Sequence, residues 1–172
     1  GKKIMVDENT NEPLIKISPV PLNRGEKTFV EHIRNYYNER KDDVFAGKDV
    51  YLLRNESRKG IGFFEANNFY PDFILWVNEG KRQRVSFSDP KGLRSIRGFE
   101  DPKIQLYNLL KSEIEPKLND PDIILDSFIV SNTPYEEISF WNPCEDKSVF
   151  KKNHIVFQMD NEYIGELFGM IV

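Results

Sequence analysis

The sequence predicts an α/β fold in which a mixed β-sheet is flanked by helices. Segments with helical spacing of apolar residues alternate with strand-like segments in the order αβββαβ, followed by another strand and helix. The 172 residues are enough for one domain with a sizeable core, and 39% hydrophobic with 30% charged residues is typical of globular proteins. A single cysteine, Cys144, excludes a disulfide framework or a multi-cysteine zinc site.

Each element is predicted from its own pattern. Residues 26–40 are expected to be helical because Phe29, Ile33 and Tyr37 recur at helical spacing. A second helix is expected over residues 102–115, with Pro102 in its first turn and Pro116 ending it. Strands are predicted at residues 49–54, 69–77, 84–89, 123–130 and 154–159, with a last helix from about residue 161.

The start of the chain differs from the rest. Residues 1–25, with Pro13, Pro19 and Pro21, are expected to be an extended lead-in from a longer chain, which leaves residues 26–172 as a single domain. No apolar run approaches the roughly 18 residues of a membrane-spanning helix, so no membrane partner is expected. The single cysteine is typical of a reducing compartment, and we expect the protein to be cytoplasmic.

The charge is unevenly distributed. The net charge of −4, from 24 basic and 28 acidic residues, argues against a free-standing nucleic-acid binder. Residues 81–97 nevertheless contain six basic residues around a single acid, Asp89. A solvated face is the ordinary explanation of such a run, and a patch that contacts phosphates is the alternative.

Two of the predicted strands flank a tight turn. Gly80 can adopt the positive φ that a type II′ turn requires, so Gly80-Lys81 would form a two-residue hairpin loop. In that register Asp72 lies opposite Asp89 on one face of the hairpin, with Cβ atoms about 5 Å apart. Lys91, two residues after Asp89, returns to the same face.

Two carboxylates this close repel each other, and burial increases the cost. A divalent cation would offset it, and so would Lys91 as part of a structural ion cluster; the sequence leaves both open. A third acid is sought on the first helix, where Glu26 falls on the apolar arc and Glu31 falls opposite it. Glu26 also suits the first turn of a helix for purely dipolar reasons.

These residues resemble a known family. Pro71-Asp72 followed by Asp89-Pro90-Lys91 resembles the signature of the PD-(D/E)xK nucleases. The wider context, LLRNESRKGIGFFEANNFYPDFILWV and then FSDPKGL, is similar to the C-terminal endonuclease domain of type III restriction enzyme Res subunits and related helicase-nuclease proteins. The resemblance extends over residues 17–160 and is most specific at residues 51–93.

The resemblance implies a restriction-endonuclease-like αβββαβ core and a Mg²⁺-dependent, site-specific deoxyribonuclease. Asp72, Asp89 and the Pro90 carbonyl would bind Mg²⁺, with Mn²⁺ as a substitute, and Lys91 would be the motif lysine. Lys91 would stabilise charge on the phosphate or orient the attacking water. Glu26 would match the helical acid of the family. Asp89 stands where many of these nucleases have Glu, which shortens the metal-binding arm.

The resemblance also implies partners: double-stranded DNA, an upstream helicase part that hydrolyses ATP, and a modification (methyltransferase) subunit, in a prokaryotic cytoplasm. Arg94 and Arg97 are expected either to contact DNA phosphates or to be exposed loop residues. Two other functions stay open. One is a catalytically inactive nuclease-like module for structure or DNA docking, and the other is a DNA repair or recombination nuclease.

Overall fold

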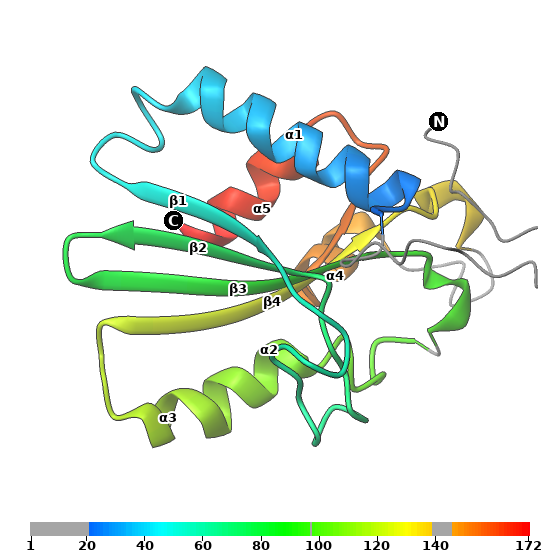
Figure 1. Ribbon diagram of the computed structural model, residues 1–172. Helices are drawn as coiled ribbons and strands as arrows, with labels where there is room; N and C mark the ends of the chain where they lie inside the picture. Colours follow the sequence, from blue (N-terminus) through cyan, green and yellow to red (C-terminus); the bar gives the residue numbers. More distant parts are fainter. Residues whose placement is uncertain (1–20, 97, 139–145) are drawn as a thin grey trace, which may run out of the picture.

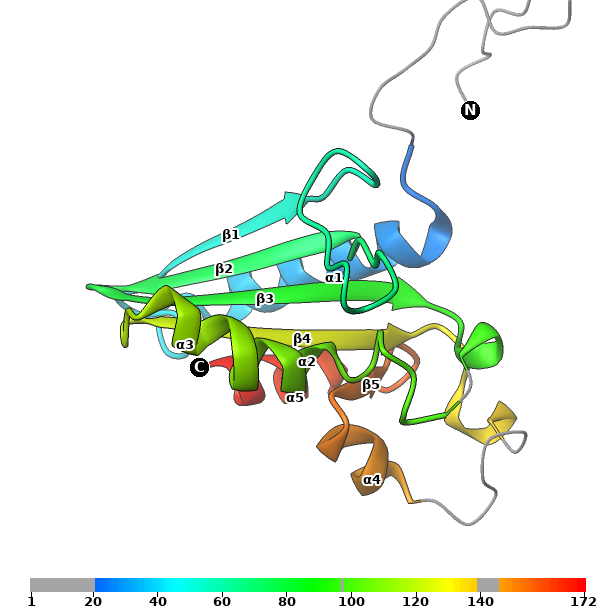
Figure 2. The same cartoon turned by 90° about the horizontal axis from the view of Figure 1, so that it is seen from below.

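The computed structural model describes residues 21–96, 98–138 and 146–172. Its centre is a five-stranded mixed sheet in the order β1-β2-β3-β4-β5 (Figures 1 and 2), which confirms the predicted α/β class. β2 is antiparallel to both β1 and β3, whereas β4 is parallel to both β3 and β5. The strands are β1 (Asp49–Arg54), β2 (Phe73–Glu79), β3 (Arg82–Lys91), β4 (Ile123–Ser131) and β5 (Ile155–Phe157).

Helices cover both faces of the sheet (Figures 1 and 2). On one face, α1 (Arg24–Arg40) and α5 (Tyr163–Ile171) bury a core with β2 and β4. The other face is covered by a helix made of α2 (Leu106–Leu109), a π-helical segment (Leu110–Ile114) and α3 (Glu115–Leu118). The remaining elements are α4 (Lys147–Lys152) and the 3₁₀ turns Leu93–Ser95 and Tyr135–Glu137. None of the helices described has the length and hydrophobicity that crossing a membrane requires.

The second predicted helix is displaced along the chain. It begins at Leu106 rather than residue 102, and it continues past Pro116 to Leu118. The π-helical segment explains the second error: the Glu115 N–H donates to the Leu110 carbonyl, five residues back, and this wider turn accommodates the proline ring. The helix ends instead at Asn119, which has a φ of 50°.

Strand and helix bounds also shift. β2 begins at Phe73, not at residue 69, because the preceding loop turns through two left-handed residues, Asn67 (φ 56°) and Asn68 (φ 53°). β5 is shorter than the predicted strand at 154–159. The first helix starts at Arg24 because Asn23 caps it, and α4 was not predicted.

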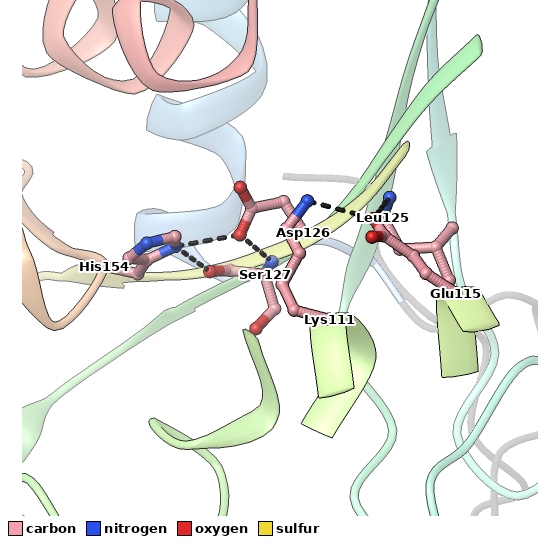
Figure 3. Close-up of polar contacts among 6 residues, drawn as sticks. All are labelled: Lys111, Glu115, Leu125, Asp126, Ser127 and His154. Carbon is pink, nitrogen blue, oxygen red and sulfur yellow. Dashed lines mark hydrogen bonds and ion pairs between the residues drawn. The ribbon is translucent and has the colours of Figure 1, made fainter. Parts of the chain in front are cut away.

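The short β5 leaves the first half of β4 without a strand neighbour on its outer side, since β5 pairs only with Ile129–Ser131. Side chains take over the pairing there (Figure 3). The Leu125 N–H donates to the Glu115 carboxylate at 2.5 Å, and Lys111 donates to the same carboxylate oxygen at 2.9 Å. An exposed row of main-chain groups is thereby closed to pairing with another chain.

The next residues of this edge are covered by an acid and a histidine (Figure 3). The Asp126 carboxylate accepts the Ser127 N–H at 2.8 Å and lies 2.8 Å from Nδ1 of His154. That ring nitrogen is also 3.2 Å from the Ser127 carbonyl oxygen. The imidazole stacks on Tyr107 and Phe128, with ring centroids 3.9 and 5.0 Å away. We call Lys111, Glu115, Asp126 and His154 the β4-edge cluster.

Candidate active site

The hairpin of β2 and β3 has the predicted register. Glu79 pairs with Arg82 and Phe73 pairs with Ser88, while Gly80 takes the positive φ, 60°, at the turn. One step beyond the last paired residues, this register aligns Asp72 with Asp89. Main-chain geometry therefore brings together two acids that are far apart in the sequence.

The two carboxyl groups are close enough for the charge of Asp89 to act on Asp72. Asp89 is only 3% exposed, and Asp72 is partly buried. The pKa of Asp72 is raised to about 7, first by burial, then by the charge of Asp89 and the hydrogen bond to it, and further by the charge of Glu26. The charge of Lys91 acts in the opposite direction. The site is therefore short of positive charge.

Lys91 is the basic side chain that contacts the acid pair directly. Its ammonium forms an ion pair with Oδ2 of Asp89, and its Nζ is 5.0 Å from the centroid of the Phe69 ring. Lys103 lies over the same ring at 5.8 Å. The carboxylate and the ring fix the Lys91 ammonium at the rim of the pair, as an ion pair and a cation–π contact.

Glu26 is close to this pair, and it also caps the helix. Its carboxylate accepts the Asn23 N–H at 2.9 Å, and the Asn23 side chain accepts the Glu26 N–H at 2.9 Å, which makes a capping box. Arg54 lies 3.7 Å from the same carboxylate oxygen of Glu26. Glu31 is half exposed and pairs with Lys27, so the structure favours Glu26 over Glu31 as the neighbour of Asp72.

The end of β3 is held by the chain that follows β4. The Asn132 N–H donates to the Lys91 carbonyl at 3.0 Å, and the Leu93 N–H donates to Oγ1 of Thr133 at 3.1 Å. Pro90 lies in the part of β3 that extends past the residues paired with β2. A proline is tolerated there because it interrupts no hydrogen bond to that neighbour.

One positioning residue, Asn55, was missed in the sequence. Its side-chain amide donates to the Pro71 carbonyl at 2.8 Å and to the Ile61 carbonyl at 2.7 Å, and its main-chain N–H donates to the Asp72 carbonyl at 2.8 Å. Gly60 permits this packing, since a Cβ there would lie 2.0 Å from Oδ1 of Asn55. The sequence signal for this role is the spacing of Asn55 and Gly60, five residues apart in the loop that leads to Pro71-Asp72.

Of the two candidate DNA-contacting arginines, the structure describes Arg94. Arg94 donates to Glu137 at 2.7 Å, and both side chains are more than half exposed. Arg97 lies outside the described residues. Their proposed contacts with phosphates stay predictions.

The donors at the pair suit a hard divalent cation. Within the described ranges, no three His, Cys, Asp or Glu side chains form a metal-ligating set, so the side-chain donors are two carboxylates, those of Asp72 and Asp89. Mg²⁺ is ordinarily bound by one or two carboxylates and keeps several waters, so this set fits it, with the Pro90 carbonyl as a further oxygen. Among the described residues, Oδ2 of Asp89 is buried and accepts no hydrogen bond beyond its ion pair with Lys91.

Comparison of the chain with protein-family models, with curated proteins and with solved structures finds no match. The motif and the hairpin geometry that carries it are therefore the features of this chain that indicate a function.

Proposed function

We propose that this chain is a metal-dependent DNA endonuclease domain of the PD-(D/E)xK type, similar to the endonuclease domain of a type III restriction Res subunit or a related helicase-nuclease. The observation that carries the proposal is the hairpin register. It aligns Asp72 with Asp89 at the end of the sheet and adds Lys91 to the same cluster.

In this proposal Asp72, Asp89 and the Pro90 carbonyl hold Mg²⁺, or Mn²⁺ in its place. When bound, such an ion supplies a Lewis acid and a water of lowered pKa for phosphodiester hydrolysis. The carboxyl pair contributes negative charge that is not matched by Lys91 alone, which is the driving force for taking up a cation.

Lys91 acts on the substrate side of the pair. Its ammonium is anchored by Asp89 and by the Phe69 ring, so it is already oriented when a phosphate arrives. A preorganised cation stabilises charge that develops on a phosphate oxygen without reorganisation during the reaction. Asn55 contributes indirectly, because it fixes the main chain of Pro71 and Asp72.

The proposed partners follow the same resemblance. Double-stranded DNA is the substrate, an upstream helicase part provides ATP-driven movement, and a modification subunit reads the sequence. The net charge of −4 is consistent with weak DNA affinity of this part alone, because neighbouring parts then supply most phosphate contacts.

A second candidate is a nuclease-like module without activity, in which the acids and Lys91 form a structural ion cluster. The direct ion pair of Lys91 with Asp89 favours it. The two candidates differ in what a metal does, since a structural cluster gains nothing from Mn²⁺ or Mg²⁺.

Plasmid cleavage tests the proposal. We expect the purified chain to nick or cut supercoiled DNA with Mn²⁺ or Mg²⁺, and EDTA to stop it. Asp72→Ala should lower the rate by at least about 100-fold. Glu31→Ala is the matched control, since it removes an exposed acid from α1, and it should keep full activity. Cleavage that persists in EDTA or in folded Asp72→Ala would contradict the proposal.

A further inference from the structure

A cavity of about 820 Å³ opens between α1 and the chain from Gln158 to Ile164, which leads from β5 into α5. Its volume lies within the range of about 300–1,000 Å³ that is usual for small-molecule sites. The feature that distinguishes its wall is a set of side-chain amides, contributed by Asn35, Asn132, Gln158 and Asn161.

The cavity adjoins the candidate active site through two segments. Gly25 lines it, and the next residue is Glu26, whose charge acts on Asp72. Asn132 also lines it, and the Asn132 N–H donates to the Lys91 carbonyl at 3.0 Å. The cavity and the acid pair are therefore connected at the start of α1 and in the chain that follows β4.

Asn132 is held where its amide faces neighbours without side chains. A Cβ on Gly25 would lie 3.1 Å from its Nδ2, and a Cβ on Gly92 would lie 3.2 Å from its Oδ1. Within the described part of the chain, no side-chain hydrogen bond engages the amides of Asn132, Asn35 or Asn161. These groups have donors and acceptors left for a ligand.

The floor of the cavity is fixed. Gln158 is only 8% exposed, and its Nε2 donates to the Gly25 carbonyl at 2.9 Å. The hydroxyl of the buried Tyr163 lies 3.0 Å from Nδ1 of His32. These bonds tie α1 to the start of α5, so the wall is formed before any ligand arrives.

The chemistry of the wall suits a base better than a phosphate. Arg24 is offset by Glu39 and Asp160, which also line the cavity, so no strong positive field attracts a bare anion. Asn and Gln amides match the mixed donors and acceptors on the edge of a nucleobase. Tyr36 adds an aromatic wall, already stacked on Phe168 with centroids 5.5 Å apart.

We propose that this cavity receives one unpaired nucleobase from the DNA strand whose phosphate lies at Asp72 and Asp89. The inference depends on the proposed nuclease function for the identity of the strand. Its consequence is a substrate preference: DNA with an unpaired or easily extruded base next to the bound phosphate binds better than an uninterrupted duplex.

Binding in EDTA tests this without catalysis. Fluorescence anisotropy would compare a labelled 20-base-pair duplex with the same duplex carrying one unpaired base, at fixed salt. We expect about tenfold tighter binding of the second, which Asn132→Ala abolishes. Asn35→Ala, at an exposed position of α1, should weaken the preference even if Asn132→Ala fails to fold. Asn38→Ala, an exposed asparagine of α1 outside the cavity, is the matched control.

The outcomes separate the two proposals. Equal affinity for both duplexes, or a preference that survives Asn132→Ala and Asn35→Ala, would overturn the cavity assignment even if Mn²⁺-dependent cleavage is observed. If both variants lose the preference for the duplex with an unpaired base, the cavity assignment is supported, even if no cleavage occurs and the nuclease proposal fails. A free deoxynucleoside monophosphate that competes at equal concentration would assign the cavity to free nucleotides and overturn the strand-bound base.

Discussion

Two clusters on this sheet contain two carboxylates beside basic side chains, one where β2 begins and β3 ends and the other along the outer edge of β4 (Figure 3). In the β4-edge cluster each carboxylate accepts a main-chain N–H and contacts its own basic side chain. At the hairpin end, Asp72 and Asp89 face each other, and Lys91 pairs with only one of them. Carboxylates that are fully paired with groups of the same chain stabilise the fold. Carboxylates with too little positive charge around them favour binding of a positively charged ligand.

Removing the Lys91 cation should have the largest effect on stability. Lys91→Met leaves the buried Asp89 without its partner, and we expect the free energy of unfolding to fall by about 3–5 kcal/mol in EDTA at pH 8. Lys103→Met is the matched control, since Lys103 contacts the same ring and forms no ion pair with a carboxylate among the described residues. Urea unfolding measures both. Equal losses in the two variants would mean that the Phe69 contact matters and the ion pair does not.

The next substitution is the same change made in both clusters. Asp126→Asn weakens the bonds to the Ser127 N–H and to His154, so we expect a loss of about 1–2 kcal/mol in the free energy of unfolding. Asp72→Asn should have the opposite sign, because it removes repulsion. Thermal unfolding at pH 8 without metal compares the two variants. If both substitutions changed the free energy of unfolding in the same direction, the proposed difference between the two clusters would be wrong.

The pH dependence follows from the raised pKa of Asp72, about 7 against about 3.9 in an unfolded chain. Between these values the folded state holds the proton and the unfolded state has lost it, so stability falls as pH rises from about 4 to 7 and then levels off. Because Asp72 is only partly buried, we expect a change of about 1–2 kcal/mol rather than the full shift. Relative to wild type, Asp72→Asn should therefore gain stability at pH 8 and not at pH 4.5, in EDTA.

The smallest effect is expected at Arg94. Its pair with Glu137 is exposed on both sides, so Arg94→Ala should change the free energy of unfolding by less than about 0.5 kcal/mol. If Arg94 contacts a phosphate, the salt dependence of DNA binding should lose about one unit of slope. An unchanged slope would remove Arg94 from the DNA-contacting surface.

The sequence was sufficient where local pattern determines geometry. Period-two alternation and the Gly80 turn predicted the register that aligns Asp72 with Asp89, and the apolar arc of the first helix distinguished Glu26 from Glu31. Prediction from the sequence failed where contacts between elements determine the local backbone conformation. The π-helical turn before Pro116 could not be anticipated, because proline ordinarily ends a helix.

Two features of the site could not be predicted for the same reason. Asn55 acts through bonds to Ile61 and Pro71, which only the folded loop brings within reach. The β4-edge cluster depends on how short β5 is, and hydrophobic patterning overestimated that strand. Both depend on contacts that form only in the folded chain and that no local pattern of residues specifies.

The most direct measurement is thermal unfolding of the wild-type chain and Asp72→Asn with increasing Mg²⁺ or Mn²⁺ at pH 8. An ion that binds only the folded state adds about 2.7 kcal/mol of stability at 100 times its Kd. We predict a concentration-dependent rise for the wild-type chain, reversed by EDTA and strongly reduced in Asp72→Asn. No rise in the wild-type chain, or the same rise in both, would contradict a cation site at Asp72 and Asp89.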